Sequence, residues 1–475
     1  MTRKAASIAL LLLVFATHPA PGQGGDRPPA PGAQGSSNIH IVAHVLLGGW
    51  LRTADLDIEQ ELSRPYAYVA IDEEASPRGG AGIPTGIDII SLKEPTRARV
   101  IYSWRIDQPE LHTGLGSLNP MHLKSHGRYF LTGAFQFRPG GPDAELGAIV
   151  WDVTRLPDTT TIKEVARITG IPGGFHESFS YKHSSGRALL FGTSLRGPAY
   201  VFDIDKVVLA GSKGADGLVG RIPLPEGTEA PIVVPGFTGY HDFYVGYDPA
   251  SHQDRFYGAG AQGYYIYDIT DLSAPRLLTS ITGVAGVPFG HTFTPDPTGR
   301  YVVAETEHQY QPLRIFDLKP GLDGQVKSIS RPIGAWTADW KHLSHNHEVR
   351  WPYVFVAALE DGFHVFNMMD PTNPYSVGYY DTYDGPNGKN SAGVLGAVFN
   401  GAWGVDVRNA DGLIVISDFT TGFWAFKMDG FDGWNGHQWG MPNISSAQDW
   451  DDGPEGAPKP QKVSATAAPH TPRSL

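Results

Sequence analysis

The chain contains 475 residues and carries a formal net charge of −12, with 58 glycines, 38 prolines and no cysteine. An acidic chain without a basic run is unsuited to binding nucleic acid through its phosphates, because that requires clustered Lys and Arg. The lack of cysteine excludes disulfides, thiolate nucleophiles and cysteine-based metal sites, so any metal ligands must be His, Asp or Glu. Abundant Gly, Pro and aromatic residues, without apolar residues at helical spacing, predict an all-β protein of short strands and tight turns.

Residues 1–22 have the pattern of a secretory signal peptide. Arg3 and Lys4 precede an apolar run, Ala5 to Ala16, that is too short to remain as a membrane span. Residues 23–37 are rich in Pro and Gly and are predicted to form a flexible leader. We therefore expect an exported protein, secreted or periplasmic, with no transmembrane segment after signal cleavage.

A strand-like segment recurs along the chain at intervals of roughly 50 to 65 residues, a period typical of propeller arrays. Most copies are apolar runs that end on Asp or Asn, whose side chain can accept backbone N–H bonds in the following turn. The copies are Gly86–Pro95, Gly147–Val153, Pro198–Asp205, Gly263–Pro275, Pro312–Leu318, Gly362–Pro374 and Gly422–Asp429.

Every copy has a partner strand before it, and most have another strand after it. The partner strands are Tyr66–Ile71, Tyr129–Phe135, Ala188–Thr193, Arg255–Ala261, Tyr301–Thr306, Tyr353–Leu359 and Leu413–Phe419. With one further short strand at its start, each unit has four antiparallel strands, which is the make-up of a propeller blade. The sequence thus predicts a seven-bladed β-propeller over residues 38–430.

The two ends of the repeat predict how the ring closes. The segment Ile39–Leu47 resembles an outer strand and has no blade before it, whereas the last unit stops at Asp429 without an outer strand. We expect the N-terminal strand to pair with the last blade, because this removes the free edge of an open array. Residues 431–475 are predicted to be a C-terminal tail that is largely disordered.

The repeat resembles a known family. A Y-V-F-V-A strand, a glycine and a V-F-D-like run ending in D-P-x-x-P, clearest in Tyr264 to Pro275 and Tyr353 to Pro374, are similar to the LVIVD repeat of secreted bacterial β-propellers. The second and third units depart from this pattern, with Leu156-Pro157 and an insertion at Asp205 in place of the closing motif. The resemblance implies a seven-bladed propeller and an exported location, and it implies little about chemistry.

Histidines recur where the first strand of a predicted unit begins. They are His122, His176, His241, His291 and His345, with His347 two residues along the last of these strands and therefore expected on the same face. The equivalent positions lie near Ala54 to Leu56 in the first unit and at Trp403 in the last. Because first strands line the channel of a propeller, we expect these imidazoles to converge at one channel mouth as candidate ligands for copper, iron or zinc.

A structural role would explain the same recurrence without a metal. Each imidazole could donate a ring N–H to a carbonyl of the neighbouring blade, although such a role should recur in every blade and two units lack the histidine. Glu305 and Glu307, at the end of a partner strand, are either solvated turn residues or a site for calcium or for acid–base chemistry. Glu177 and Asp242, which follow channel histidines, are predicted to contact the neighbouring blade.

Three functions remain open from the sequence. The first is an exported LVIVD-type propeller that acts as a binding or scaffold module for a protein, glycan or small-molecule ligand through its rim loops and channel mouth. The second is a metal-dependent enzyme in which the channel histidines hold copper, iron or zinc. The third is polysaccharide binding or lyase activity. The sequence assigns no catalytic residue and no organic cofactor.

Overall fold

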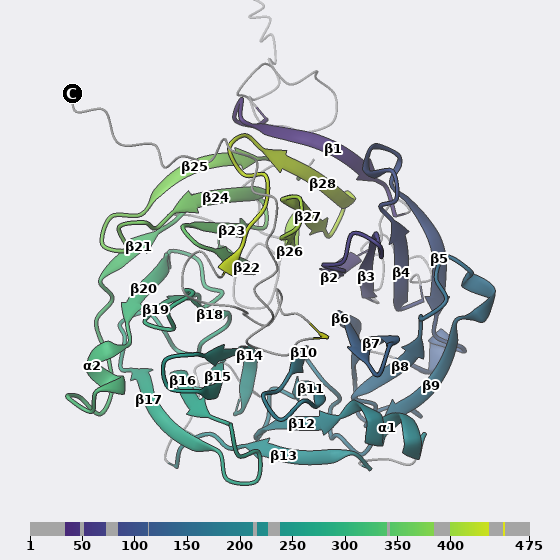
Figure 1. Cartoon of the computed structure of the whole chain (residues 1–475), viewed down its shortest axis with the longest axis horizontal. Helices are drawn as coiled ribbons and strands as arrows, with labels where there is room; N and C mark the ends of the chain where they lie inside the picture. The colour runs from purple at the N-terminus through teal and green to yellow at the C-terminus, as the bar shows by residue number, and fades with distance from the viewer. Residues whose placement is uncertain are drawn as a thin grey trace, which may run out of the picture.

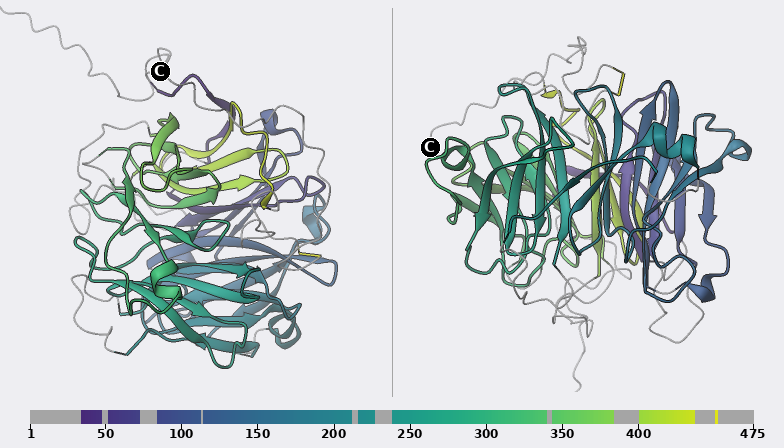
Figure 2. Two further views of the ribbon diagram at one scale, coloured as in Figure 1. Left: turned by 60° about the vertical axis from the view of Figure 1, so that its left-hand side comes forward. Right: turned by 90° about the horizontal axis from the view of Figure 1, so that it is seen from below.

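The structure of the protein is a computed structural model that describes residues 34–47, 52–72, 84–112, 114–211, 216–226, 238–339, 343–383, 400–436 and 450–451. The described chain is mostly β-structure, with its sheets arranged around a central axis as in a β-propeller (Figure 1). Seen from the side, the molecule is a thick disc whose strands run through its thickness (Figure 2). The predicted all-β, propeller-type fold is confirmed. The predicted signal peptide and most of the predicted tail lie outside the described residues.

Within the described ranges, five separate four-stranded antiparallel sheets surround the axis. Written from the innermost strand outward, they are β10 (Glu177–Lys182), β11 (Ala188–Thr193), β12 (Ala199–Asp203) and β13 (Leu218–Ile222); β14 (Tyr240–Asp248), β15 (Gln253–Gly260), β16 (Gly263–Asp268) and β17 (Arg276–Thr282); β18 (Phe293–Pro295), β19 (Tyr301–Ala304), β20 (Leu313–Asp317) and β21 (Gly334–Trp336); β22 (His347–Arg350), β23 (Tyr353–Ala357), β24 (Phe363–Asn367) and β25 (Tyr375–Tyr380); and β26 (Ala402–Arg408), β27 (Leu413–Asp418), β28 (Gly422–Met428) and β1 (Ile39–Val45).

The other strands form a single eight-stranded sheet. Its halves are β2 (Arg52–Ile58), β3 (Tyr66–Asp72), β4 (Gly86–Ser91) and β5 (Arg99–Arg105), then β6 (Gly114–Ser125), β7 (Arg128–Phe137), β8 (Ala148–Asp152) and β9 (Lys163–Ile168). The pair Asp72 and Gly116 joins β3 to β6 and so joins the two halves. The prediction of seven separate blades is therefore corrected, because the long strand β6 begins early enough to reach the end of β3.

The N-terminal strand β1 is the outermost strand of the last sheet. It pairs antiparallel with β28 from Ile39 opposite Met428 to Val45 opposite Phe423. This pairing between the two ends of the repeat is the one predicted from the sequence. The residues just before β1 lie along β25, where Ser36 N donates to Tyr379 O at 3.0 Å.

Helices are short and lie in the connections between strands. They are α1 (Ile204–Ala210), α2 (Lys319–Leu322) and the 3-10 helices η1 (Pro95–Arg97), η2 (Pro109–Leu111) and η3 (Thr159–Thr161). The Asp that ends a repeat copy has the predicted turn role: Asp268 accepts a hydrogen bond from Thr270 N at 3.1 Å. None of the helices in the described ranges has the length and apolar character needed to cross a bilayer.

Burial explains why the partner strands read as continuous apolar runs. Strands β3 and β11 are buried along their whole lengths, whereas β5, at the rim, is half-buried to exposed. A strand between two other strands, in a sheet packed on both faces, has no solvent-facing side to fill with polar residues. The innermost strands are consequently held rigidly around the axis, and their starting residues can form a defined site.

Candidate metal centre

The innermost strands share a β-bulge at or just before their start. In β14, His241 and Asp242 lie together opposite Ala259, because Tyr240 pairs with Gly260 and Phe243 pairs with Gly258. A bulge places two residues opposite one and re-aims their side chains. The other bulges are Ala54–Asp55, Leu118–Asn119, His176–Glu177, His291–Thr292, His345–Asn346 and Trp403–Gly404.

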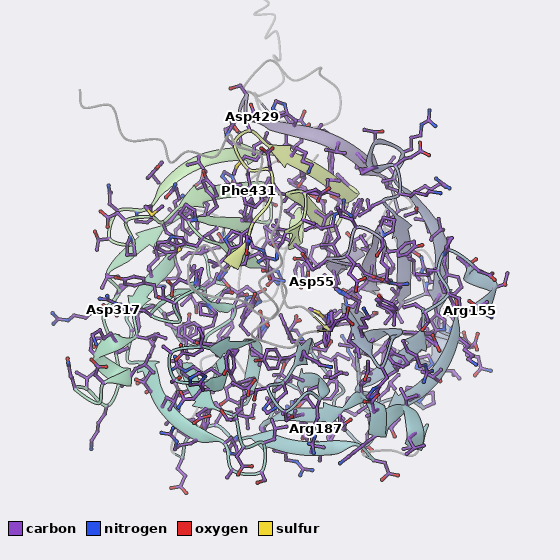
Figure 3. The ribbon with its side chains drawn as sticks, viewed as in Figure 1. Asp55, Arg155, Arg187, Asp317, Asp429 and Phe431 are labelled. Atoms are coloured by element: carbon purple, nitrogen blue, oxygen red, sulfur yellow. The ribbon has the colours of Figure 1, made fainter. Side chains whose placement is uncertain are left out.

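The bulges arrange their residues in two rings around the axis. We call the first residues the first ring: Ala54, Leu118, His176, His241, His291, His345 and Trp403. We call the second residues the second ring: Asp55, Asn119, Glu177, Asp242, Thr292, Asn346 and Gly404. Asp55 marks the second ring near the centre of the molecule (Figure 3).

Four imidazoles of the first ring pack against one another. The ring centroids of His176 and His241 are 4.2 Å apart, those of His241 and His291 are 4.1 Å apart, and those of His291 and His345 are 4.5 Å apart. The indole of Trp403 continues the row, with its centroid 3.7 Å from that of His345. The structure thus brings together four of the six histidines proposed from the sequence.

Oxygen acceptors hold the outward-facing nitrogens of three of these rings. His176 Nδ1 lies 2.7 Å from Gln136 Oε1, and His345 Nδ1 lies 2.9 Å from the Trp403 carbonyl oxygen. His291 Nδ1 forms its hydrogen bond with Thr292 Oγ1, at 2.8 Å, and Glu305 Oε2 lies 2.9 Å from the same nitrogen. A carbonyl oxygen can only accept, so Nδ1 of His345 carries the proton and its Nε2 keeps a free lone pair. This is the arrangement by which proteins orient metal-binding imidazoles.

The Nε2 atoms face one another and the carboxyl group of Glu307. His176 Nε2 and His241 Nε2 are 2.9 Å apart. Glu307 Oε2 lies 3.4 Å from His291 Nε2 and 3.9 Å from His241 Nε2, and its Oε1 lies 3.7 Å from His345 Nε2. Ligand atoms of His241, His291 and Glu307 all lie within 4.8 Å of one another. His241, His291 and Glu307 therefore form a compact group of ligand atoms, which His176 flanks through His241 and His345 flanks through Glu307.

Burial keeps these groups neutral. It lowers the pKa of His176 and of His345 to about 3, and it lowers the pKa of His241 and His291 well below the usual range of histidine. Burial also raises the pKa of Glu307 to about 8. Neutral imidazole is the form that binds a metal ion, so protons do not compete for these nitrogens near neutral pH.

Hydrogen bonds connect much of the second ring. Asn119 Nδ2 donates to Glu177 Oε2 at 2.9 Å, and Asn346 Nδ2 donates to Asp55 Oδ2 at 2.7 Å. Thr292 Oγ1 donates to Asn346 Oδ1 at 3.0 Å. Desolvation raises the pKa of Asp55 and of Glu177 well above the usual range of carboxyl groups. These carboxyl groups line a cavity in the channel whose lining histidines are His122 and His347.

His122 does not belong to the first ring, which corrects its assignment as a candidate ligand. The bulge of β6 lies at Leu118 and Asn119, so His122 is four residues further along the strand than the position equivalent to His176. Its Nδ1 lies 2.6 Å from Asp57 Oδ2. Although burial by itself lowers it, the charge of Asp57 and the hydrogen bond to it raise the pKa of His122 to about 9.

His347 is also outside the cluster. It was expected beside His345 because residues two apart share a face of a regular strand. The bulge at His345 and Asn346 breaks this alternation before β22 begins, since both residues lie opposite Ala357. His347 is buried on that strand, and burial lowers its pKa to about 3.

The positions of several residues at or near the site were not predicted from the sequence. Glu307 was considered only as a rim carboxylate, and it reaches the histidines because its backbone turns with a φ of 45° immediately after β19. Glu177 and Asp242 line the channel cavity, and Glu177 also makes the expected contact with a neighbouring unit, since it accepts a hydrogen bond from Asn119 on β6. Gln136, at the end of β7, has no sequence signal that sets it apart from the surrounding strand.

Comparison with models of known protein families finds no match, and comparison with curated proteins finds no relative. The likeness to the LVIVD repeat therefore remains a prediction from the sequence.

Proposed function

We propose that the protein is a metal-dependent enzyme whose ion sits on the propeller axis, held by His176, His241, His291 and His345 with Glu307 beside them. The observation that carries this proposal is the orientation of the rings. Hydrogen bonds to Gln136, Thr292 and the Trp403 carbonyl oxygen hold Nδ1 of His176, His291 and His345, and leave their Nε2 atoms toward the neighbouring imidazole or the Glu307 carboxyl group. When bound, the ion supplies Lewis-acid or redox chemistry to a small molecule that enters from the channel mouth.

The spacing of the nitrogens suits coordination. An ion about 2.0–2.1 Å from each of two imidazole nitrogens keeps them about 2.9–3.4 Å apart, for angles from about 90° to the tetrahedral value. His176 Nε2 and His241 Nε2 are 2.9 Å apart, and His291 Nε2 is 3.4 Å from the Glu307 carboxyl group. His241 Nε2 and His345 Nε2 lie 3.9 Å and 3.7 Å from that carboxyl group and would move closer to it when an ion binds. Without an ion, the first of these separations is a hydrogen bond between the two rings. A donor set of imidazoles and one carboxylate favours iron, copper or zinc over magnesium or calcium.

The charge around the site also favours a cation. Within the described ranges, no Lys, Arg or His forms an ion pair with Asp55, Glu177 or Asp242 of the second ring. Further along the channel, carboxylates do have such partners: Asp57 pairs with His122, and Arg350 pairs with both Glu348 and Asp406. A divalent ion beside the second ring would stabilise its unpaired carboxylates in their charged form.

We further infer that the eight-stranded sheet acts as two adjacent blades. Strands β2 to β5 and β6 to β9 each repeat the four-strand order and the bulge of the other sheets, and one residue pair joins them. Counted in this way the sheets comprise seven units, and the LVIVD-like repeat of the sequence supports the same count. We retain export as part of the proposal because of the pattern of residues 1–22. A binding module is consistent with the propeller fold as well, but that role does not explain the oriented imidazoles.

Metal analysis of untagged protein tests the proposal. The protein would be stripped with a chelator, offered copper, zinc, iron(II) or manganese(II), dialysed, and measured by elemental mass spectrometry. We expect retention of about one equivalent of at least one of these ions at a four-histidine site. The His241→Ala/His291→Ala double variant should lose the ion, and His364→Ala, on β24 and outside the cluster, should keep it. A wild-type protein that retains none of these metals, or a double variant that retains its metal, contradicts the proposal.

A further inference from the structure

The first ring is divided into a polar half and an apolar half. His241 lies in the innermost strand β14, and His176, His291 and His345 lie just before the innermost strands β10, β18 and β22. The next three positions around the axis, on β26, β2 and β6, hold Trp403, Ala54 and Leu118 (Figure 1). An ion bound by the histidines would thus have its nitrogen ligands on one side and an apolar wall on the other.

Trp403 is the main element of this wall. Its ring packs against the cluster of Ala54, Ala70 and Leu118 on one side and against Leu343 and Leu359 on the other. It also lies 3.7 Å from the His345 ring and 4.0 Å from the Phe419 ring, measured between centroids. Trp403 therefore fills the part of the ring that carries no histidine, while its own carbonyl orients His345.

We propose that the molecule that binds the ion is small and neutral and that its apolar part is placed against Trp403, Ala54 and Leu118. This inference rests on the metal centre proposed above and names the class of molecule that the centre takes. The side chains of Ala54 and Leu118 offer no hydrogen bond, so a strongly hydrated ligand would lose its water without compensation. The bulk of the Trp403 side chain sets the size of molecule that fits.

The carboxyl groups around the ring disfavour an anionic ligand. Glu305 and Glu307 border the histidines directly, and Glu177 and Asp242 follow two of them in the chain. A bound cation favours the charged form of these carboxyl groups, so a negatively charged ligand on the ion would meet like charges at close range. A neutral ligand avoids this repulsion.

Cobalt(II)-loaded full-length protein provides a test, because its visible absorption reports changes at the ion. The probes are methyl isocyanide and n-butyl isocyanide as neutral ligands and azide as an anion. We expect the wild-type protein to bind methyl isocyanide more tightly than azide and to bind n-butyl isocyanide weakly. Burying each added methylene is worth about fourfold in affinity, so Trp403→Ala should tighten n-butyl isocyanide binding by up to about 60-fold and change methyl isocyanide binding by less than about threefold.

Controls separate this inference from the metal proposal. Trp434→Ala removes a buried tryptophan that contacts Trp351, away from the ring, and should leave all three affinities unchanged. If Trp403→Ala does not fold, as judged by circular dichroism, Leu118→Phe narrows the same space and should weaken methyl isocyanide binding by more than about tenfold. Tighter binding of azide than of methyl isocyanide, or affinities that do not respond to either variant, overturns the inference while the metal centre stands. A wild-type protein that takes up none of the transition metals offered refutes the metal centre itself.

Discussion

Two buried histidine environments in one channel show how differently the same side chain can behave. His176 and His122 are both 9% exposed and both lie near the axis. The pKa of His176 is lowered to about 3 by burial, whereas the charge of Asp57 and the hydrogen bond to it outweigh burial and raise the pKa of His122 to about 9. Burial alone does not identify a metal ligand; the partner of Nδ1 and the surroundings of Nε2 do.

Removing His122 should have the largest effect on stability. His122→Ala leaves the buried carboxylate of Asp57 without its cation, and breaking a buried ion pair in this way typically costs about 3–5 kcal/mol. Urea unfolding of the metal-free protein measures the loss. His364→Ala, at a half-buried ring without an ion pair, serves as the control and should cost less. Equal losses in the two variants would show that the Asp57 pair adds nothing to stability.

The same pair predicts how stability changes with pH. The folded-state pKa of His122 is about 9, above its unfolded value near 6.5, so its contribution of about 3 kcal/mol is fully present below pH 6.5 and is lost as the pH rises through 9. Unfolding free energy measured from pH 6 to pH 10 should fall in wild type more steeply than in His122→Gln. Identical slopes would contradict the raised pKa. The pKa of the first-ring histidines is lowered, so their effect has the opposite sign: stability falls as the pH drops below 6.5.

A glycine substitution tests the second ring, which lies between the environments of His176 and His122. A Cβ atom at Gly404 would lie 2.0 Å from Asp55 Oδ1. Gly404→Ala should therefore displace Asp55 and cost about 1–3 kcal/mol, the usual price of overpacking. Gly246→Ala, on β14, is the matched control because the added atom meets nothing within 4 Å. Thermal unfolding of both variants compares the effects, and an unchanged Gly404→Ala protein would mean that Asp55 moves at no cost.

The smallest change concerns the orientation of the metal ligands. Gln136→Ala removes the acceptor that holds His176 Nδ1, and loss of such an outer partner typically weakens metal binding by about 10- to 100-fold. Competition with a chromogenic chelator measures this affinity. Gln253→Ala, on β15, should leave it unchanged. A Gln136→Ala protein with wild-type affinity would show that packing alone orients His176.

The parts of the fold that could be predicted from the sequence are the strands that appear in it as apolar runs. Strand β3 was expected at Tyr66–Ile71 and spans Tyr66–Asp72, and the pairing of β1 with β28 was expected from an outer-type strand at one end of the repeat. Burial on both faces of these strands produces a pattern that a single sequence displays. The single pair between Asp72 and Gly116, which merges two units into one sheet, leaves no such pattern.

The site was predicted less completely because it depends on bulges. A bulge adds one residue to a strand and leaves the composition of that strand unchanged, so it cannot be recognised in the spacing of the histidines. His122 therefore seemed equivalent to the first-ring histidines, and His347 seemed to share a face with His345, although neither belongs to the first ring. Glu307 lies in a turn, where a backbone φ of 45° rather than strand alternation sets the direction of the side chain. His176, His241, His291 and His345 were found because they occupy the same position in successive repeats.

The pairing of β1 with β28 also constrains the order in which the protein folds. His40 on β1 contacts Asp429 just after β28, 389 residues further along the chain. During synthesis β1 emerges first, but its partner is made near the end, so the last sheet is completed only after the other sheets are available. Contacts between residues so far apart in the sequence slow folding. Until β28 has been synthesised, β1 remains unpaired and can pair with a strand of another chain instead. We therefore expect the joining of β1 to β28 to be a late step in folding.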